Sequence, residues 1–229
     1  MKGIISAFAL AVLAGNVQAQ VGHLPQNSPY RDVETKQELT FFGGRYTAGK
    51  DPIGIAPEDG PMYGLRYQIH VGGPAFLTAR WSHVNSERVA IDPLKTGNAR
   101  QLGKHNVSIN LYDVNLALNL TGQKSFHHII PVINVGAGIA SCGCSVPNDP
   151  YKFGTPFAFA YGGGLRWVPG GRFQLTADWN HYLYQLKYPT DYYVAPTTGG
   201  TPAVPSDQQR SFWKGNRALT LGASLLFFR

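Results

Sequence analysis

The sequence predicts an all-β fold: an eight-stranded antiparallel up-and-down transmembrane β-barrel that follows a cleaved signal peptide. Three observations predict it. The chain begins with an export signal, eight later segments alternate apolar and polar residues, and the joints between these segments are alternately long and short. A closed membrane barrel has this asymmetry because one end needs only tight hairpins, while the other end carries the elaborated loops.

The N-terminus has the pattern of a secretory signal peptide. Lys2 supplies a positive charge, an apolar run follows from Gly3 to Ala14, and Val17-Gln18-Ala19 forms a small-residue cleavage pattern. We therefore divide the chain into a signal peptide (1–19), a periplasmic N-terminal segment (20–37) and the barrel (38–229). The segment 20–37 is expected to be either an extended tail or a plug that folds into the lumen.

Export and strand pattern together predict the cellular location. Away from the N-terminus no apolar stretch approaches the roughly 18 residues that a membrane-spanning helix needs. An exported chain of alternating strands is therefore expected in the bacterial outer membrane, with both termini in the periplasm.

The eight strands are expected in order around Glu38–Ala48, Tyr63–Val71, Leu77–Ser82, Tyr112–Leu120, Ile129–Ile139, Phe157–Trp167, Phe173–Asn180 and Leu219–Phe227. Short joints are expected at 72–74, 121–125 and 169–171, and long loops at 49–60, 86–103, 141–155 and 188–209. The seventh segment shows the alternation clearly: Phe173, Leu175, Ala177 and Trp179 share one face, and Gln174, Thr176, Asp178 and Asn180 share the other. A barrel wall demands this pattern because alternate residues face lipid and lumen.

Two segments are less regular. The first has no clear facing around Phe41 and Phe42, and in the fifth Ile130 and Val132 fall on the face that is otherwise polar or small. The fourth loop, which contains Thr197 to Pro202, is rich in Pro and Gly and is expected to be mobile.

Charged residues on the inward faces predict the content of the lumen. The expected cluster comprises Arg66, Arg80, Asp113, Arg166, Asp178 and His70, joined by Glu38 or Arg45. An interior of eight strands is just wide enough for side chains to fill, and charges buried there must be paired. A plug of salt bridges is therefore expected, and a gated ion path is the alternative.

Aromatic residues gather near the ends of the segments. They are Tyr63, Trp81, Tyr112, Phe157, Trp167, Phe173, Trp179, Tyr182, Tyr184, Phe227 and Phe228. Rings with an apolar body and a polar tip favour the level of the lipid headgroups, so these residues predict two aromatic girdles.

The formal net charge is +7, and 7 minus 1 for Lys2 leaves +6 for the mature chain. Because export excludes nucleic acid as a partner, the expected partners are outer-membrane lipid and lipopolysaccharide. The basic residues on or near the loops are Lys95, Arg100, Lys104, Lys152, Lys187, Arg210 and Lys214. Ordinary solvated loop charge is the alternative interpretation.

The chain from Glu38 to Arg229 resembles the small outer-membrane β-barrel superfamily, with the OmpA-like transmembrane barrel as the nearest general likeness. The resemblance rests on the architecture, on the hairpin from Gly162 to Phe173 and on the final strand, where Gly222, Leu225 and Phe227 resemble a terminal assembly signal. It implies the barrel-assembly machinery as a transient partner.

Cys142 and Cys144 fall in the third long loop, in an oxidising compartment. We expect a loop disulfide or two free thiols rather than a metal site, because His127 and His128 lie at the opposite end of the strand and two thiolates alone bind zinc poorly. No cofactor is predicted.

Three classes of function remain open. The first is a structural or surface-interaction barrel with a side-chain-filled lumen and loops available to ligands; the second is a narrow porin-like channel; the third is a lipid A-modifying enzyme. Such an enzyme needs a nearby His and Ser with a carboxylate. The nearest candidates are His83 with Ser86 and Glu87, and His181 with Asp178, but neither has the His and Ser two positions apart that the lipid A deacylase family carries. We predict no catalytic site.

Overall fold

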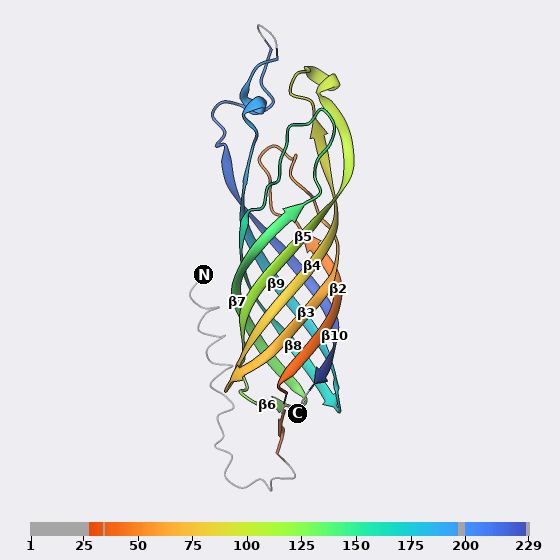
Figure 1. The fold of residues 1–229 in the computed structure, drawn as a ribbon, viewed down its shortest axis with the longest axis vertical. Helices are drawn as coiled ribbons and strands as arrows, with labels where there is room; N and C mark the ends of the chain where they lie inside the picture. Colours follow the sequence, from red (N-terminus) through yellow and green to blue (C-terminus); the bar gives the residue numbers. More distant parts are fainter. Residues whose placement is uncertain (1–27, 34, 197–199, 228–229) are drawn as a thin grey trace, which may run out of the picture.

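A computed structural model describes residues 28–33, 35–196 and 200–227. Eight long antiparallel strands form the wall of a barrel (Figure 1). They are β2 (Gln37–Thr47), β3 (Gly60–Gly72), β4 (Ala75–Ile91), β5 (Gln101–Asn119), β7 (Ile129–Cys142), β8 (Phe157–Gly170), β9 (Phe173–Lys187) and β10 (Ser211–Phe227). Each strand pairs with the next one in the wall, as the up-and-down prediction requires.

The sheet closes on itself. β10 pairs with β2 from Arg217 opposite Thr47 to Phe227 opposite Gln37. β7 pairs with both β5 and β8, so the ring of eight strands has no free edge. Closure satisfies the backbone N–H and C=O groups that an open edge would leave exposed to lipid.

The two ends of the barrel differ, and we call them the turn end and the loop end (Figure 1). At the turn end, short connections join β3 to β4 and β8 to β9. The connection from β5 to β7 is longer than the predicted 121–125 turn because it contains β6 (Lys124–Phe126), which pairs with β1 (Tyr30–Asp32). The described part of the N-terminal segment therefore lies against the turn end, and residues 20–27 lie outside the described residues.

At the loop end, β4 and β5 are longer than predicted. β4 continues to Ile91 and β5 begins at Gln101, so only residues 92–100, including a short 3-10 helix (Gly97–Arg100), connect them. The predicted loop 86–103 was wrong because buried and exposed residues keep alternating from Ser86 through Arg88. The outward residues Asn85 and Glu87 are as polar as the inward Ser86 and Arg88, so hydropathy does not alternate here and the strand was hidden in the sequence. A second 3-10 helix (Thr190–Tyr193) lies in the last loop, and residues 197–199 of the expected mobile stretch lie outside the described residues.

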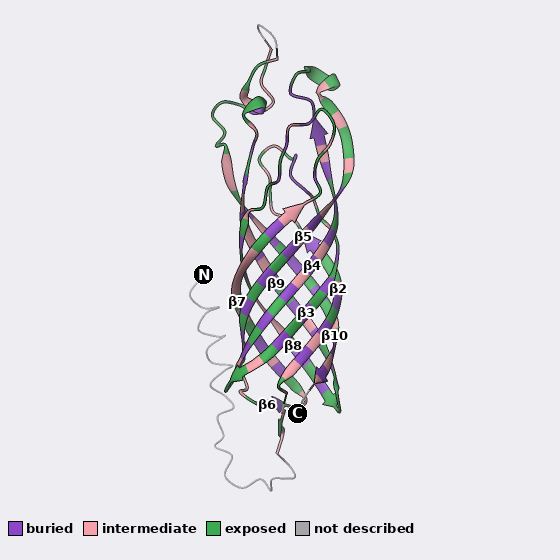
Figure 2. Cartoon of the chain, in the orientation of Figure 1, coloured by how far each residue is buried: buried purple, intermediate pink, exposed green. Residues whose placement is uncertain are grey.

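Buried and exposed residues alternate along the strands, as Figure 2 shows. The predicted facing of the second, third, fourth, sixth, seventh and eighth segments is confirmed. In the first, Glu38 is buried while the Arg45 side chain is 74% exposed and pairs with Asp59, so of the two alternatives only Glu38 faces the lumen. In the fifth, Ile130 and Val132 do face inward.

The outer face carries an apolar belt between two aromatic rims. On β3 the outward residues run from Tyr63 to Val71 through Leu65, Tyr67 and Ile69, all more than one third exposed. At about 3.3 Å per residue and a strand tilt near 40°, this stretch covers roughly 20 Å along the barrel axis, close to the ~25 Å band of known barrels. On β3 no Asp, Glu, Lys or Arg points outward between Tyr63 and Val71. The outward arginines nearest the belt are Arg45 and Arg217, each one pleat toward the loop end from Gly43 on β2 and Leu219 on β10.

The predicted girdle needs one correction. Tyr182 and Tyr184 point inward and are only 1% exposed, because they share the face of Asp178 and Asn180 on β9. Phe228 lies outside the described residues. No helix in the described part of the chain is long and apolar enough to cross a membrane.

Candidate functional site in the barrel lumen

The middle of the lumen holds a chain of ion pairs that crosses between strands. Arg66 on β3 contacts Asp178 on β9, with 2.7 Å between Nη1 and Oδ2. The second terminal nitrogen of Arg66 lies 3.6 Å from Glu38 on β2, whose other oxygen lies 3.6 Å from Arg166 on β8. All four side chains are at most 7% exposed. Thr40 also donates a hydrogen bond to Glu38. The Glu38 carboxylate therefore links Arg66 to Arg166, a connection that the alternation of inward and outward residues does not predict.

A second pair lies deeper toward the loop end. Arg80 on β4 and Asp113 on β5 are direct partners in register. Arg80 Nε donates to both carboxylate oxygens at 3.0 and 3.2 Å, and the guanidinium lies 5.3 Å from the centre of the Tyr182 ring. Gly138 on β7 makes room for them, because a Cβ there would lie 1.9 Å from the Tyr112 carbonyl oxygen and 2.6 Å from Asp113 Cα.

The charges in this middle layer balance. Arg66, Arg80 and Arg166 supply three positive charges, and Glu38, Asp113 and Asp178 supply three negative charges, so 3 minus 3 leaves none. The structure brings together five of the six predicted cluster residues and adds Glu38. His70 is the exception, because its ring bonds the Gly73 carbonyl oxygen at the turn end and makes no ion pair with the described carboxylates.

Below the ion pairs, toward the turn end, the lumen becomes apolar. Phe76, Ala117, Ile130, Val132 and Val168 form a buried cluster, and Val33 of the N-terminal segment packs against it. The two residues that interrupt the alternation of the fifth segment therefore form an apolar layer inside the barrel. Of the described residues of the N-terminal segment, Val33 is the one that packs against this layer.

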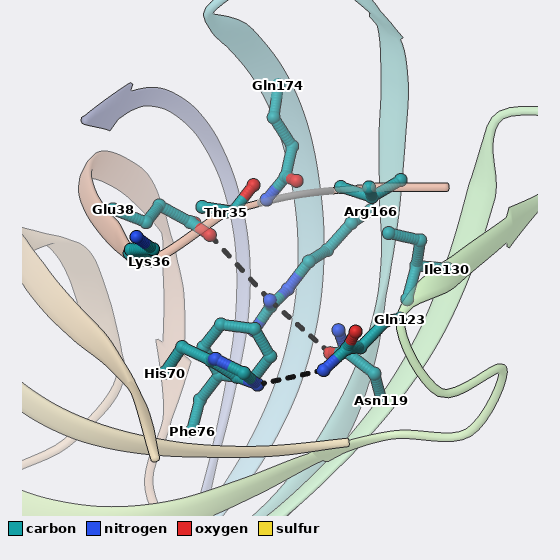
Figure 3. A pocket seen from close by; sticks show the side chains of 11 residues that line it. Thr35, Lys36, Glu38, His70, Phe76, Asn119, Gln123, Ile130, Arg166 and Gln174 are labelled. Carbon is teal, nitrogen blue, oxygen red and sulfur yellow. Dashed lines mark hydrogen bonds and ion pairs between the residues drawn. The ribbon is translucent and has the colours of Figure 1, made fainter. Parts of the chain in front are cut away.

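A cavity of about 280 Å³ opens beside this layer, and we call it the vestibule cavity. Its lining includes Val33, Thr35, Lys36, Glu38, His70, Phe76, Asn119, Gln123, Ile130, Arg166 and Gln174. Figure 3 shows Arg166 reaching across the cavity between Glu38 and Asn119, with Gln174 entering from another strand. The guanidinium therefore belongs both to the ion-pair layer and to the wall of the cavity.

The loop end is covered by its own loops. Arg88 and Asp149 form an ion pair of 2.7 Å with both side chains fully buried. Tyr192 of the last loop donates a hydrogen bond to Asp149, and Arg88 lies 4.6 Å from the centre of the Tyr151 ring. We call this group the loop cap. The loop cap could not be predicted from the sequence, because residues 141–155 and 188–209 carry no alternation that would reveal inward side chains.

Tyrosine and lysine side chains extend the loop cap. Tyr188 donates a hydrogen bond to Asp51, and burial together with this bond raises the pKa of Tyr188. Burial also raises the pKa of Tyr192 beside Asp149. Lys214 was expected among the basic residues that reach the lipid surface, but it is only 2% exposed and donates to the Pro57 carbonyl oxygen. Burial lowers the pKa of Lys214 to about 8.

Cys142 and Cys144 are joined by a disulfide, with 5.1 Å between their Cα atoms. Among the described residues no three His, Cys, Asp or Glu side chains gather at a position that could hold a metal ion. His127 and His128 lie between β6 and β7 at the turn end, in left-handed backbone conformations.

The residues considered for lipid A chemistry do not assemble. His83 faces outward and bonds Asn110, while Ser86 faces inward and donates to the Glu58 carbonyl oxygen. His181 faces outward against Tyr161, on the opposite face of β9 from Asp178. Since side chains an odd number of positions apart point to opposite faces of a strand, His83 does not lie beside Ser86, and His181 does not lie beside Asp178. Glu87 shares the outward face of His83 but pairs with Lys104.

Comparisons with known proteins agree on the fold. No protein-family model and no curated protein sequence matches this chain. The match to the crystal structure of Neisserial surface protein A covers 83% of this chain and 97% of that protein's chain, with a TM-score of 0.55 and 7% sequence identity. The match to the N-terminal β-barrel domain of Pseudomonas aeruginosa OprF covers 85% of this chain and 98% of that domain's chain, with a TM-score of 0.50 and 11% sequence identity. The predicted small outer-membrane β-barrel fold is thereby confirmed.

Proposed function

We propose that this protein is an integral outer-membrane barrel with a sealed lumen, which acts as a scaffold and binds ligands at the cell surface through its loop end. The observation that carries the proposal is the neutral, side-chain-filled lumen, in which three arginines face three carboxylates between an apolar layer and the loop cap. Eight strands enclose just enough space for such a filling. A continuous water path would require these pairs to separate inside a low-dielectric interior.

The uncharged belt supports insertion into a bilayer, since a charged side chain there would cost about 2–4 kcal/mol at the midplane. Long loops are characteristic of the outer side of such barrels, so the loop end is assigned to the cell surface and the turn end to the periplasm. Labelling with a membrane-impermeant maleimide tests this orientation. Asn98→Cys should react on intact cells, and Arg172→Cys should react only after the outer membrane is permeabilised.

Recording across planar bilayers tests the sealed lumen. The refolded full-length chain should give no unit conductance steps above those of protein-free membranes. Regular steps of constant size in the wild type would refute the scaffold interpretation and favour the narrow channel.

Basic side chains at the loop end support lipopolysaccharide as the surface partner. Lys95, Lys104, Lys152, Lys187 and Arg210 are exposed there. Their ammonium and guanidinium groups suit the phosphates of lipid A and its core. Replacing Lys95, Lys152 and Arg210 together by Gln should weaken binding to purified lipopolysaccharide and reduce its dependence on salt; unchanged binding would assign these charges to ordinary solvation.

The final strand supports a transient encounter with the barrel-assembly machinery. Leu225 and Phe227 share the outer face of β10, and Gly222 packs where a Cβ would lie 2.8 Å from the Phe41 carbonyl oxygen. Phe227→Ala is expected to lower the folded fraction in the outer membrane without changing refolding of the purified chain in detergent. Equal loss in both experiments would assign Phe227 a purely structural role.

A further inference from the structure

We propose that the vestibule cavity is a binding site for a small monocarboxylate with an apolar body. The proposal is independent of the sealed lumen, because the cavity lies on the turn-end side of the ion pairs and a ligand there need not cross the barrel. Its volume of about 280 Å³ is near the lower limit of the roughly 300–1,000 Å³ typical of small-molecule pockets.

Unsatisfied donors point to a ligand with acceptor atoms. Arg166 and Gln174 are each 3% exposed, yet Arg166 Nε and Gln174 Nε2 have no hydrogen-bond partner within the described part of the chain. The Thr35 hydroxyl is a third buried group without a described partner. All three residues line the same cavity. Buried donors are almost always bonded in native proteins, so three unpartnered groups on the wall of one cavity indicate that acceptor atoms, of water or of a ligand, lie there.

The terminal nitrogens of Arg166 already have partners. Nη2 donates to Gln68 at 2.9 Å, and Nη1 contacts Glu38 at 3.6 Å and Asn119 at 3.5 Å. Nε is the nitrogen of this side chain without a described partner, and the Gln174 amide enters the same space in Figure 3. Two adjacent N–H donors suit the two oxygens of one carboxylate.

Charge and wall chemistry narrow the ligand class. Among the described lining residues Arg166 and the exposed Lys36 are positive and Glu38 is negative, so 2 minus 1 leaves one net positive charge. A monoanion meets this balance, whereas a phosphate dianion would exceed it. Val33, Phe76 and Ile130 form an apolar wall that suits a hydrocarbon or aromatic body.

The ligand can be tested with 4-fluorobenzoate and the full-length chain in detergent, by ¹⁹F line broadening. The wild type should broaden the signal saturably, and unlabelled benzoate should compete, whereas benzyl alcohol and inorganic phosphate should not. Gln174→Leu removes one donor and should weaken binding about tenfold, as expected for a lost bond to a charged group. Arg166→Lys keeps the charge without the Nε donor and should weaken binding by a similar factor.

Thr176→Val is the matched control. Thr176 lies on the same face of β9, one pleat deeper than Gln174, and does not line the cavity. Its affinity should equal that of the wild type, and all variants should show the heat-modifiable gel migration of a folded barrel. No saturable binding by the folded wild type, equal binding of phosphate, or affinity unchanged in both Gln174→Leu and Arg166→Lys would overturn the proposal and leave a cavity filled by water.

Discussion

Neutralising Asp113 would leave Arg80 as an unpaired charge inside the barrel. The pair is well buried: its side chains are 5% and 3% exposed, and three nitrogen–oxygen contacts between 2.9 and 3.2 Å join them. Removing one member of a buried ion pair typically costs about 3–5 kcal/mol, because the remaining charge stays desolvated. We therefore expect Asp113→Asn to lower the free energy of unfolding by about 3–5 kcal/mol.

A double variant separates the charge from the packing. Arg80→Met/Asp113→Asn removes both charges of this pair, and replacing a buried pair by neutral groups is often close to neutral in stability. The double variant should therefore lie within about 1 kcal/mol of the wild type, well above the single variant. If the two side chains contributed only their volume, the second substitution would not restore the stability that the first one removes.

Urea-induced unfolding in phospholipid vesicles, followed by tryptophan fluorescence, measures these differences. All four tryptophans, Trp81, Trp167, Trp179 and Trp213, lie on outward positions and report departure from the bilayer without touching the pair. The reasoning would be refuted if Asp113→Asn cost less than about 1 kcal/mol, or if the double variant were no more stable than the single variant.

Three further predictions concern packing, the loop cap and pH. Gly138→Leu should prevent barrel folding, seen as loss of the heat-modifiable gel band, because a Cβ at this position would overlap the neighbouring strand; normal folding would contradict the close approach. Asp149→Asn should expose the last loop to protease while the barrel stays folded, because it leaves Arg88 without its buried carboxylate; equal protease resistance would mean that the loop cap does not depend on this pair. The pKa of Lys214 is about 8 in the folded chain and about 10.4 in an opened loop. Between these two pH values the opened state binds more protons than the closed state. The closed loop therefore gains stability as pH rises from about 8 to 9.5. Protection factors for amide exchange in residues 48–59 should rise over this pH interval, which lies below the pH at which the tyrosines ionise. In Lys214→Met the protection factors should not rise. A rise that persists in Lys214→Met would mean that another group causes the pH dependence.

Facing could be predicted from the sequence wherever one side of a strand meets lipid and the other meets polar neighbours. Which inward side chains contact one another across the lumen could not be predicted from the sequence. Arg66 and Asp178 are 112 positions apart and lie on strands that are not neighbours in the wall. Which inward side chains meet across a barrel depends on the stagger and tilt of the strands, and a period of two residues contains no information on either.

The errors of facing near the loop end have other causes. Arg45 was ambiguous because Phe41 and Phe42 are both apolar, and only the register with β10 places Phe42 and Glu38 on the inner face. Tyr182 and Tyr184 have the amphipathic ring that suits a membrane interface, yet they lie on the inner face of β9. Residue type predicted the membrane interface for these two tyrosines, whereas the alternation of side chains along the strand predicted the lumen. The alternation was the better guide because the backbone of a strand fixes it.

On the proposed function, three successive layers of different chemistry fill the lumen, and this arrangement determines how the conductance test is interpreted. An apolar layer at the turn end excludes ions because of desolvation, the middle layer holds its charges in pairs, and the loop cap covers the opposite mouth. Removing one ion pair leaves the other two layers intact, so Arg80→Met/Asp113→Asn should be as non-conducting as the wild type. Conductance that appeared in this variant alone would mean that the middle layer is the only seal and that the apolar layer and loop cap are permeable.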